Sequence, residues 1–138
     1  MIAGANRSHV LDSFAVLAWL QGEPKGAAVT ALLKRARHGE IVLSICVINL
    51  GEVLYIVERE DSIQAAQRTL ATIDRLPLRQ VSAERDLTLL AAHLKAIYRM
   101  SYADCFCLAL AKAANAILVT GDPEFRAQTE VDLFWIGE

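Results

Sequence analysis

Apolar residues recur along this chain in two alternating patterns, short continuous runs and longer stretches with a period of three to four residues. Short runs are typical of buried strands, and the longer period is typical of helices that bury one face. Val29, Leu32, Leu33 and Ala36 form such a stripe, which predicts a helix over residues 25–38. We also predict strands at 9–11, 41–44, 78–81, 117–120 and 133–136, and helices at 13–21 and 46–58, after a cap at Asp61 or Ser62, after Ser82, from Ser101 to about 115, and briefly from Asp122-Pro123.

The alternation of strands and helices predicts an α/β fold with a mostly parallel sheet and helices on both faces. No linker, repeat or low-complexity stretch interrupts it, so we expect residues 1–138 to form one domain, with 1–8 as a loose N-terminal tail. Ligands of such sheets bind beyond the carboxyl ends of the strands. A functional site is therefore expected at that edge.

The composition argues against a membrane or secreted protein. Although 54% of the 138 residues are hydrophobic, no run reaches the roughly 18 apolar residues that a membrane helix needs. The first residues lack the apolar core of a signal peptide. Cys46, Cys105 and Cys107 are expected to be buried, reduced thiols, and the protein is expected to be cytoplasmic.

Four acidic residues interrupt apolar segments: Asp12, Glu52, Asp104 and Asp122. An isolated buried carboxylate costs several kcal/mol or takes up a proton. Convergence on a divalent cation would remove that cost, and oxygen ligands suit Mg²⁺ or Mn²⁺. The net charge of −2 permits a polyanionic substrate but does not require one, since bound cations would offset the acids.

Simpler roles exist for three of these acids. Asp12 and Asp122 stand where they can cap helices, and Asp104 lies three residues after Ser101, as in a capping box. Glu52 has no such role in the middle of its predicted helix. The polar neighbours Ser13, Asn49 and Thr120 are able to orient a carboxylate or a water molecule, or to serve only as caps and strand-edge residues.

With these motifs in this order, the chain resembles PIN-domain ribonucleases, most closely the toxins of VapBC-type toxin–antitoxin pairs. The resemblance covers nearly the whole length. It rests on Val10-Leu11-Asp12-Ser13, Asn49-Leu50-Gly51-Glu52-Val53, Ser101-Tyr102-Ala103-Asp104 and Val119-Thr120-Gly121-Asp122-Pro123-Glu124-Phe125.

The resemblance implies a three-layer fold with a five-stranded sheet in the order 3-2-1-4-5. It implies an endoribonuclease dependent on Mg²⁺ or Mn²⁺, with Asp12, Glu52, Asp104 and Asp122 as the catalytic and metal-binding acids and Ser13, Asn49 and Thr120 as their polar support. It also implies a cognate VapB-type antitoxin, and we expect a homodimer.

Other functions remain open at this point. A housekeeping or DNA-directed nuclease of the flap type would use the same acids, and a non-catalytic RNA-binding module would share the fold. A phosphatase or receiver domain with Asp12 as phosphoacceptor is disfavoured, because Phe14 stands where a phosphatase needs an acid and no lysine follows Thr120.

Contacts to substrate or partner are less determined by the sequence. Lys34, Arg35 and Arg37, with His38, end a predicted helix and are candidates for phosphate contacts, although cations there also suit the helix dipole. Trp19 and Leu20 belong either to the core or to a docking surface for a partner helix.

Overall fold

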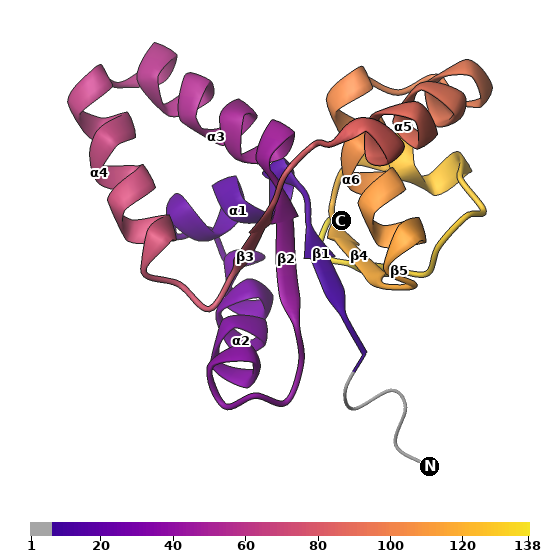
Figure 1. Cartoon of the computed structure of the whole chain (residues 1–138). Helices are drawn as coiled ribbons and strands as arrows, with labels where there is room; N and C mark the ends of the chain where they lie inside the picture. Colours follow the sequence, from indigo (N-terminus) through magenta and orange to yellow (C-terminus); the bar gives the residue numbers. More distant parts are fainter. Residues whose placement is uncertain (1–6) are drawn as a thin grey trace.

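The computed structural model describes residues 7–138, which form a five-stranded sheet with helices on both faces (Figure 1). Every neighbouring strand pair is parallel, and the order β3-β2-β1-β4-β5 confirms the predicted fold. The elements are β1 (His9–Leu11), α1 (Ser13–Leu20), α2 (Gly26–Arg37), β2 (Leu43–Cys46), α3 (Val47–Glu60), α4 (Ile63–Asp74), β3 (Arg79–Val81), α5 (Arg85–Ile97), α6 (Tyr102–Ala113), β4 (Ile117–Thr120), the 3₁₀ helix η1 (Pro123–Ala127) and β5 (Leu133–Trp135).

Apolar strand residues alternate between two core clusters, one on each side of the sheet. Val10 and Leu118 pack with α5 and α6, whereas Leu11 and Val119 pack in the cluster that includes residues of α1, α2 and α3. Successive side chains of a strand point to opposite faces, so a sheet covered on both faces needs apolar residues at every position. This requirement explains the short continuous apolar runs of the sequence.

Several predicted boundaries are wrong by two or three residues, and the third helix, α3, ends at Glu60 instead of Glu58. The second strand was expected at 41–44 but is β2, Leu43–Cys46, because its pairing with β1 starts at Leu43 and its pairing with β3 ends at Cys46. Ser82 does not cap a helix. Glu84 precedes α5, and the Thr88 backbone N–H closes the first turn on the Glu84 carbonyl.

The start of the chain was predicted to be a loose tail over residues 1–8, and residues 1–6 lie outside the described residues. Arg7 forms an ion pair with Asp132 at 3.1 Å, and the Ser8 carbonyl accepts a hydrogen bond from the Ile117 backbone N–H. Among the described residues, no helix is long and apolar enough to cross a membrane.

The carboxyl ends of the central strands bring distant parts of the chain together. Leu11, the last residue of β1, pairs with Val119 of β4, so Asp12 and Thr120 follow side by side. α3 starts directly after β2 at the same edge, and α6 starts there before its chain returns through β4. All four predicted acids are therefore carried to one edge of the sheet.

Candidate functional site

Asp12 lies at the end of β1 and caps α1. Its Oδ1 accepts a hydrogen bond from the Ala15 backbone N–H at 2.8 Å, and its Oδ2 accepts one from the Thr120 hydroxyl. The residue is 1% exposed. Burial raises the pKa of Asp12 to about 7, against the lowering effect of the two hydrogen bonds, and the nearby charges of Asp104 and Asp122 raise it further.

Asp104 lies in the first turn of α6, where the Ser101 hydroxyl caps the helix by accepting from the Asp104 backbone N–H at 3.1 Å. Burial, followed by the charges of Asp122, Glu52 and Glu124, raises the pKa of Asp104 to about 7, and the Ser101 hydroxyl lowers it slightly. The residue is 7% exposed.

Asp122 lies two residues beyond β4 and caps η1. Its Oδ1 accepts from the Glu124 backbone N–H at 3.0 Å, and its own N–H donates to the Thr120 hydroxyl oxygen at 3.0 Å. The Thr120 hydroxyl therefore donates to Asp12 and accepts from Asp122. One side chain thus fixes two of the acidic segments relative to each other.

Glu52 lies on α3, where the side-chain amide of Asn49 holds it. Asn49 Nδ2 donates to Glu52 Oε1 at 3.1 Å and to the Ala103 carbonyl at 3.0 Å, one residue before Asp104. Asn49 is fully buried, and its Oδ1 has no hydrogen-bond partner among the described residues. Ser13, the third predicted support residue, is half-buried, and its hydroxyl makes no hydrogen bond within residues 7–138.

The hydrogen bonds that cap the helices also position three acids of the candidate site. Asp12, Asp104 and Asp122 are each placed at a helix start by local hydrogen bonds, and the sheet brings those helix starts together. Carboxylate oxygens of Asp104, Asp122 and Glu124 all lie within 4.8 Å of one another. Asp12 and Glu52 are not part of that tightest group. The charge of Glu52 acts on Asp104, and the charges of Asp104 and Asp122 act on Asp12.

Glu124 was not identified as a site residue from the sequence. It stands in the first turn of η1 after Asp122-Pro123, where an acidic residue is common for helix-dipole reasons alone. The available signal was its position two residues after a predicted site acid.

The donor set suits a hard divalent cation. It consists of carboxylate oxygens, the ligands that Mg²⁺ and Mn²⁺ prefer, and the Asp104 residue among them is largely buried. The like charges that raise the pKa of Asp104 would be offset by such an ion. Asp104, Asp122 and Glu124, with Asp12 and Glu52 beside them, are the residues able to hold it.

The structure does not bring the predicted basic residues to the acids. Lys34, Arg35 and Arg37 lie in the last turn of α2, which leads to the amino end of β2, whereas the acids lie at the carboxyl ends of the strands (Figure 1). Arg35 forms an exposed ion pair with Glu40 at 3.6 Å.

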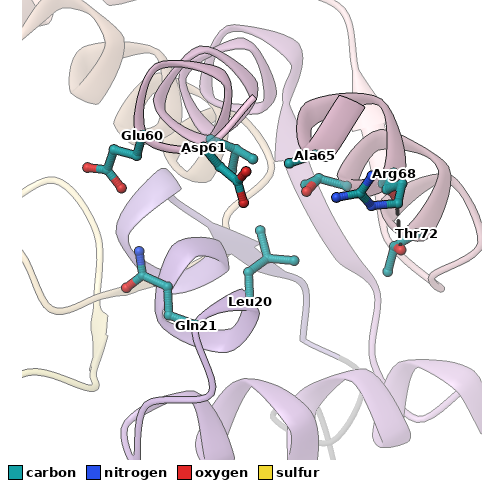
Figure 2. Close-up of a pocket in the computed structure, with 9 residues that line it drawn as sticks. Leu20, Gln21, Glu60, Asp61, Ala65, Arg68 and Thr72 are labelled. Atoms are coloured by element: carbon teal, nitrogen blue, oxygen red, sulfur yellow. Dashed lines mark hydrogen bonds between the residues drawn. The ribbon is translucent and has the colours of Figure 1, made fainter. Parts of the chain in front are cut away.

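A separate pocket of about 350 Å³ lies between α1, α3 and α4, and none of its lining residues belongs to the acidic site (Figure 2). Leu20 and Gln21 of the α1 end, Asp61 and Arg68 contribute to its walls. Trp19 and Leu20 are both half-buried and pack against the core, and Leu20 also lines an open hollow.

Comparison with known proteins gives a family and a fold. A sequence profile described as the PIN domain matches residues 9–130. Similar solved structures include VapBC2 from Rickettsia felis bound to a DNA fragment from its promoter, with a TM-score of 0.73, 20% identity, and coverage of 92% of this chain and 97% of that chain. A toxin–antitoxin complex from Klebsiella pneumoniae has a TM-score of 0.73 and 15% identity, over 94% of this chain and 98% of that one.

VapC20 from Mycobacterium tuberculosis, described as a toxin that cleaves the sarcin–ricin loop, has a TM-score of 0.65 at 19% identity, over 90% of this chain and 98% of that chain. No curated protein sequence matches the chain. At these identities the structural matches establish the shared fold.

Proposed function

The chain belongs to the PIN domain family, and from that membership we propose that it is a divalent-metal-dependent endoribonuclease that hydrolyses RNA phosphodiester bonds, with Asp12, Glu52, Asp104 and Asp122 as its acidic quartet. The proposal includes Mg²⁺ or Mn²⁺ as the cation, the cytoplasm as its location, and the role of toxin in a type II toxin–antitoxin pair.

One observation carries the proposal: carboxylates from four separate segments meet at one edge of the sheet, where they crowd around the largely buried Asp104. Without a bound cation this crowding destabilises the fold, because burial and like charges raise the pKa of both Asp12 and Asp104 to about 7. Perturbed acids grouped in this way are typical of functional sites.

The residues of the chain have separable tasks in this proposal. Thr120 holds Asp12 in one orientation through its hydroxyl, and Asn49 holds Glu52 beside the backbone that carries Asp104. When bound, the cation supplies positive charge that stabilises the transition state at phosphorus and makes water a better nucleophile at neutral pH. No serine, cysteine or histidine nucleophile is required.

The test is cleavage of a structured RNA by the purified protein with Mn²⁺, with Mg²⁺ and with EDTA. We expect cleavage with either ion and none with EDTA, and Asp104→Asn should lower the rate by about 100-fold or more, the scale of losing one preorganised electrostatic group. Glu58→Gln, an exposed substitution on the same helix as Glu52, is the matched control and should cleave as wild type.

The two alternative functions give different results in the same assay. A DNA-directed nuclease of the flap type would cut the DNA version of the substrate in preference to the RNA. A non-catalytic RNA-binding module would retain RNA in a filter-binding assay, and cleavage would be absent with either ion.

The toxin role is proposed because two of the structures similar to this chain are described as a VapBC protein and a toxin–antitoxin complex. We propose a VapB-type antitoxin as partner and a homodimer as the assembly. Expression should arrest growth, Asp104→Asn should not, and co-expression of the antitoxin should restore growth. Harmless expression of an active nuclease would instead indicate a housekeeping role, and a monomer in sedimentation at micromolar concentration would contradict the dimer.

A further inference from the structure

An arginine and a tryptophan are stacked on each other at the edge of the sheet that carries the acids. The guanidinium carbon of Arg126, in η1, lies 4.4 Å from the centroid of the Trp135 ring, in β5. We propose that Arg126 and Trp135, together with Lys25 across a neighbouring hollow, bind the nucleotides of single-stranded RNA that flank the cleaved phosphodiester. We call these three residues the C-terminal shelf. This inference rests on the proposed function for the choice of RNA as the ligand.

Strand pairing places Trp135 beside the acidic site. Trp135 is the register partner of Thr120, whose hydroxyl donates to Asp12 and accepts from the Asp122 backbone N–H. Neighbouring strands are about 5 Å apart, and side chains two residues apart on a strand share a face. Leu133 packs with the cluster that contains α6 residues and Phe125 of η1, so Trp135 lies on the same face of the sheet as α6 and η1. A nucleotide on Trp135 is therefore next to a phosphate at the acids.

The segment after β5 is packed tightly against the acidic site. The Ile136 backbone N–H donates to the Thr120 carbonyl at 3.0 Å, which continues the pairing of β4 with β5 up to the edge. A Cβ on Gly137 would lie 2.7 Å from the carbonyl oxygen of Gly121, the residue that directly precedes Asp122. This close approach requires glycine at position 137 and fixes the position of Trp135 relative to the acids.

A hollow of about 320 Å³ lies between this segment and the start of α2, and Lys25 lines it. The Lys25 ammonium is 4.8 Å from the centroid of the Phe14 ring and 3.7 Å from a carboxylate oxygen of Glu23. The Lys25 and Glu23 side chains are each one-third exposed, and exposed ion pairs contribute little to stability. A phosphate oxygen can therefore take the place of the Glu23 carboxylate beside Lys25.

The chemistry of the C-terminal shelf fits a single strand. Bases of any kind stack on aromatic rings and on guanidinium planes, and cations contact the phosphates between them. Arg126 donates one hydrogen bond to the Glu138 carbonyl at 2.7 Å, so most of its five N–H groups remain for phosphate.

The position of these contacts carries the argument, because cation–π pairs occur about once per 70–80 residues in proteins of every kind. Three such pairs lie within residues 7–138. One of them contains Lys25, which lines the hollow. Another contains Arg126 and Trp135, both of which donate to the main-chain oxygen of Glu138, another lining residue. Two of the three pairs thus adjoin one hollow beside the acids.

The experiment measures binding of a labelled single-stranded RNA of about ten nucleotides by fluorescence anisotropy. It uses the Asp104→Asn background, which suppresses cleavage, with Mg²⁺ present. Arg126→Gln and Lys25→Gln should each reduce the slope of log affinity against log salt by about 0.7 between about 50 and 200 mM KCl, the value for one phosphate contact of a single strand. Trp135→Leu should weaken binding about tenfold without changing that slope, and Trp135→Phe should bind within about threefold of the background, since any aromatic ring can stack on a base.

Arg59→Gln is the matched control. Arg59 is also stacked on an aromatic ring, with its guanidinium carbon 5.1 Å from the Tyr55 centroid, but it lies in the last turn of α3. It should bind RNA as the background does. Circular dichroism establishes that each variant is folded, and if Trp135→Leu is not, the salt slopes of the two charge variants and the affinity of Trp135→Phe decide.

The outcomes separate this inference from the proposed function. Unchanged salt slopes in both charge variants, or an equal loss in Arg59→Gln, overturn the C-terminal shelf and leave the acidic site intact. Tighter binding of a DNA strand of the same sequence overturns RNA as the ligand of the shelf. A wild-type protein that neither binds nor cuts RNA overturns the proposed function together with this inference.

Discussion

The crowding of carboxylates at the carboxyl edge of the sheet should weaken the metal-free protein in a way that one substitution can measure. The pKa of Asp104 is about 7 in the folded protein and 3.8 as a free group. Between these two values the folded state binds more protons than the unfolded state, so the free energy of unfolding falls as the pH rises from about 4 to about 7. Asp104→Asn removes this dependence because the amide does not titrate.

The size of the effect follows from the two pKa values. At about 1.36 kcal/mol per pH unit, the rise of about 3 pH units corresponds to about 4 kcal/mol at pH 8, and the portion that develops between pH 5 and pH 8 is about 3 kcal/mol. The free energy of unfolding of Asp104→Asn, relative to that of wild type, should therefore rise by about 3 kcal/mol when the pH is changed from 5 to 8. For a chain of this length that is roughly 10 °C in Tm.

The assay is urea unfolding in EDTA at pH 5 and pH 8, followed by circular dichroism. Asp86→Asn is the control, because Asp86 is fully exposed in α5 and its loss should change stability by less than about 0.5 kcal/mol at either pH. The reasoning is refuted if Asp104→Asn is equally destabilised at both pH values. That result would mean that Asp104 matters only for the start of α6.

Three further predictions concern cation binding, the hydrogen bond between Thr120 and Asp12, and the packing around Gly121. Because a proton and a cation compete for carboxylates with a pKa of about 7, Mn²⁺ affinity measured by calorimetry should be about tenfold lower at pH 6 than at pH 8; pH-independent affinity would contradict the raised pKa values. Thr120→Val should destabilise the protein in urea by about 2 kcal/mol at pH 8, since it removes a hydrogen bond to the charged Asp12, and by less at pH 5; an equal loss at both would place the effect elsewhere. Gly121→Ala should cost about 1–3 kcal/mol in thermal unfolding, because its Cβ would overlap the Phe14 ring and lie 2.9 Å from the Gly137 nitrogen; an unchanged Tm would show that this packing gives way freely.

The order of the sheet and the edge at which the acids meet were predictable from the sequence. The strand order was implied by the family resemblance alone, whereas the edge follows from apolar periodicity and from the position of each acid after a strand or at a helix start. Helix starts were also predicted correctly where a side chain caps the helix. Ser62 and Ser101 are examples, since their hydroxyls accept hydrogen bonds from the backbone N–H groups of Ala65 and Asp104.

What the sequence did not reveal depends on contacts between distant residues. The start of β2 is set by pairing with β1 and β3, so local hydropathy alone placed it two residues too early, at Ile41. Glu124 looked like an ordinary first-turn acid, and its closeness to Asp104 arises only when α6 and η1 are packed on the same face of the sheet. The link from Asn49 to the Ala103 carbonyl is equally invisible in the local sequence.

The hydrogen bond between Asp12 and Thr120 joins residues 108 positions apart, across the central pair of strands. During synthesis β1 emerges early, but it has no partner on the β4 side until nearly all of the described residues have been made. Contacts between such distant segments form late, because the chain must close a long loop before they contribute any stability. A ribosome-attached chain that ends before β4 has neither Asp122 nor the hydroxyl that orients Asp12. If the finished protein cuts RNA, a growing chain thus lacks a complete site until β4 and η1 have been made and have joined the sheet.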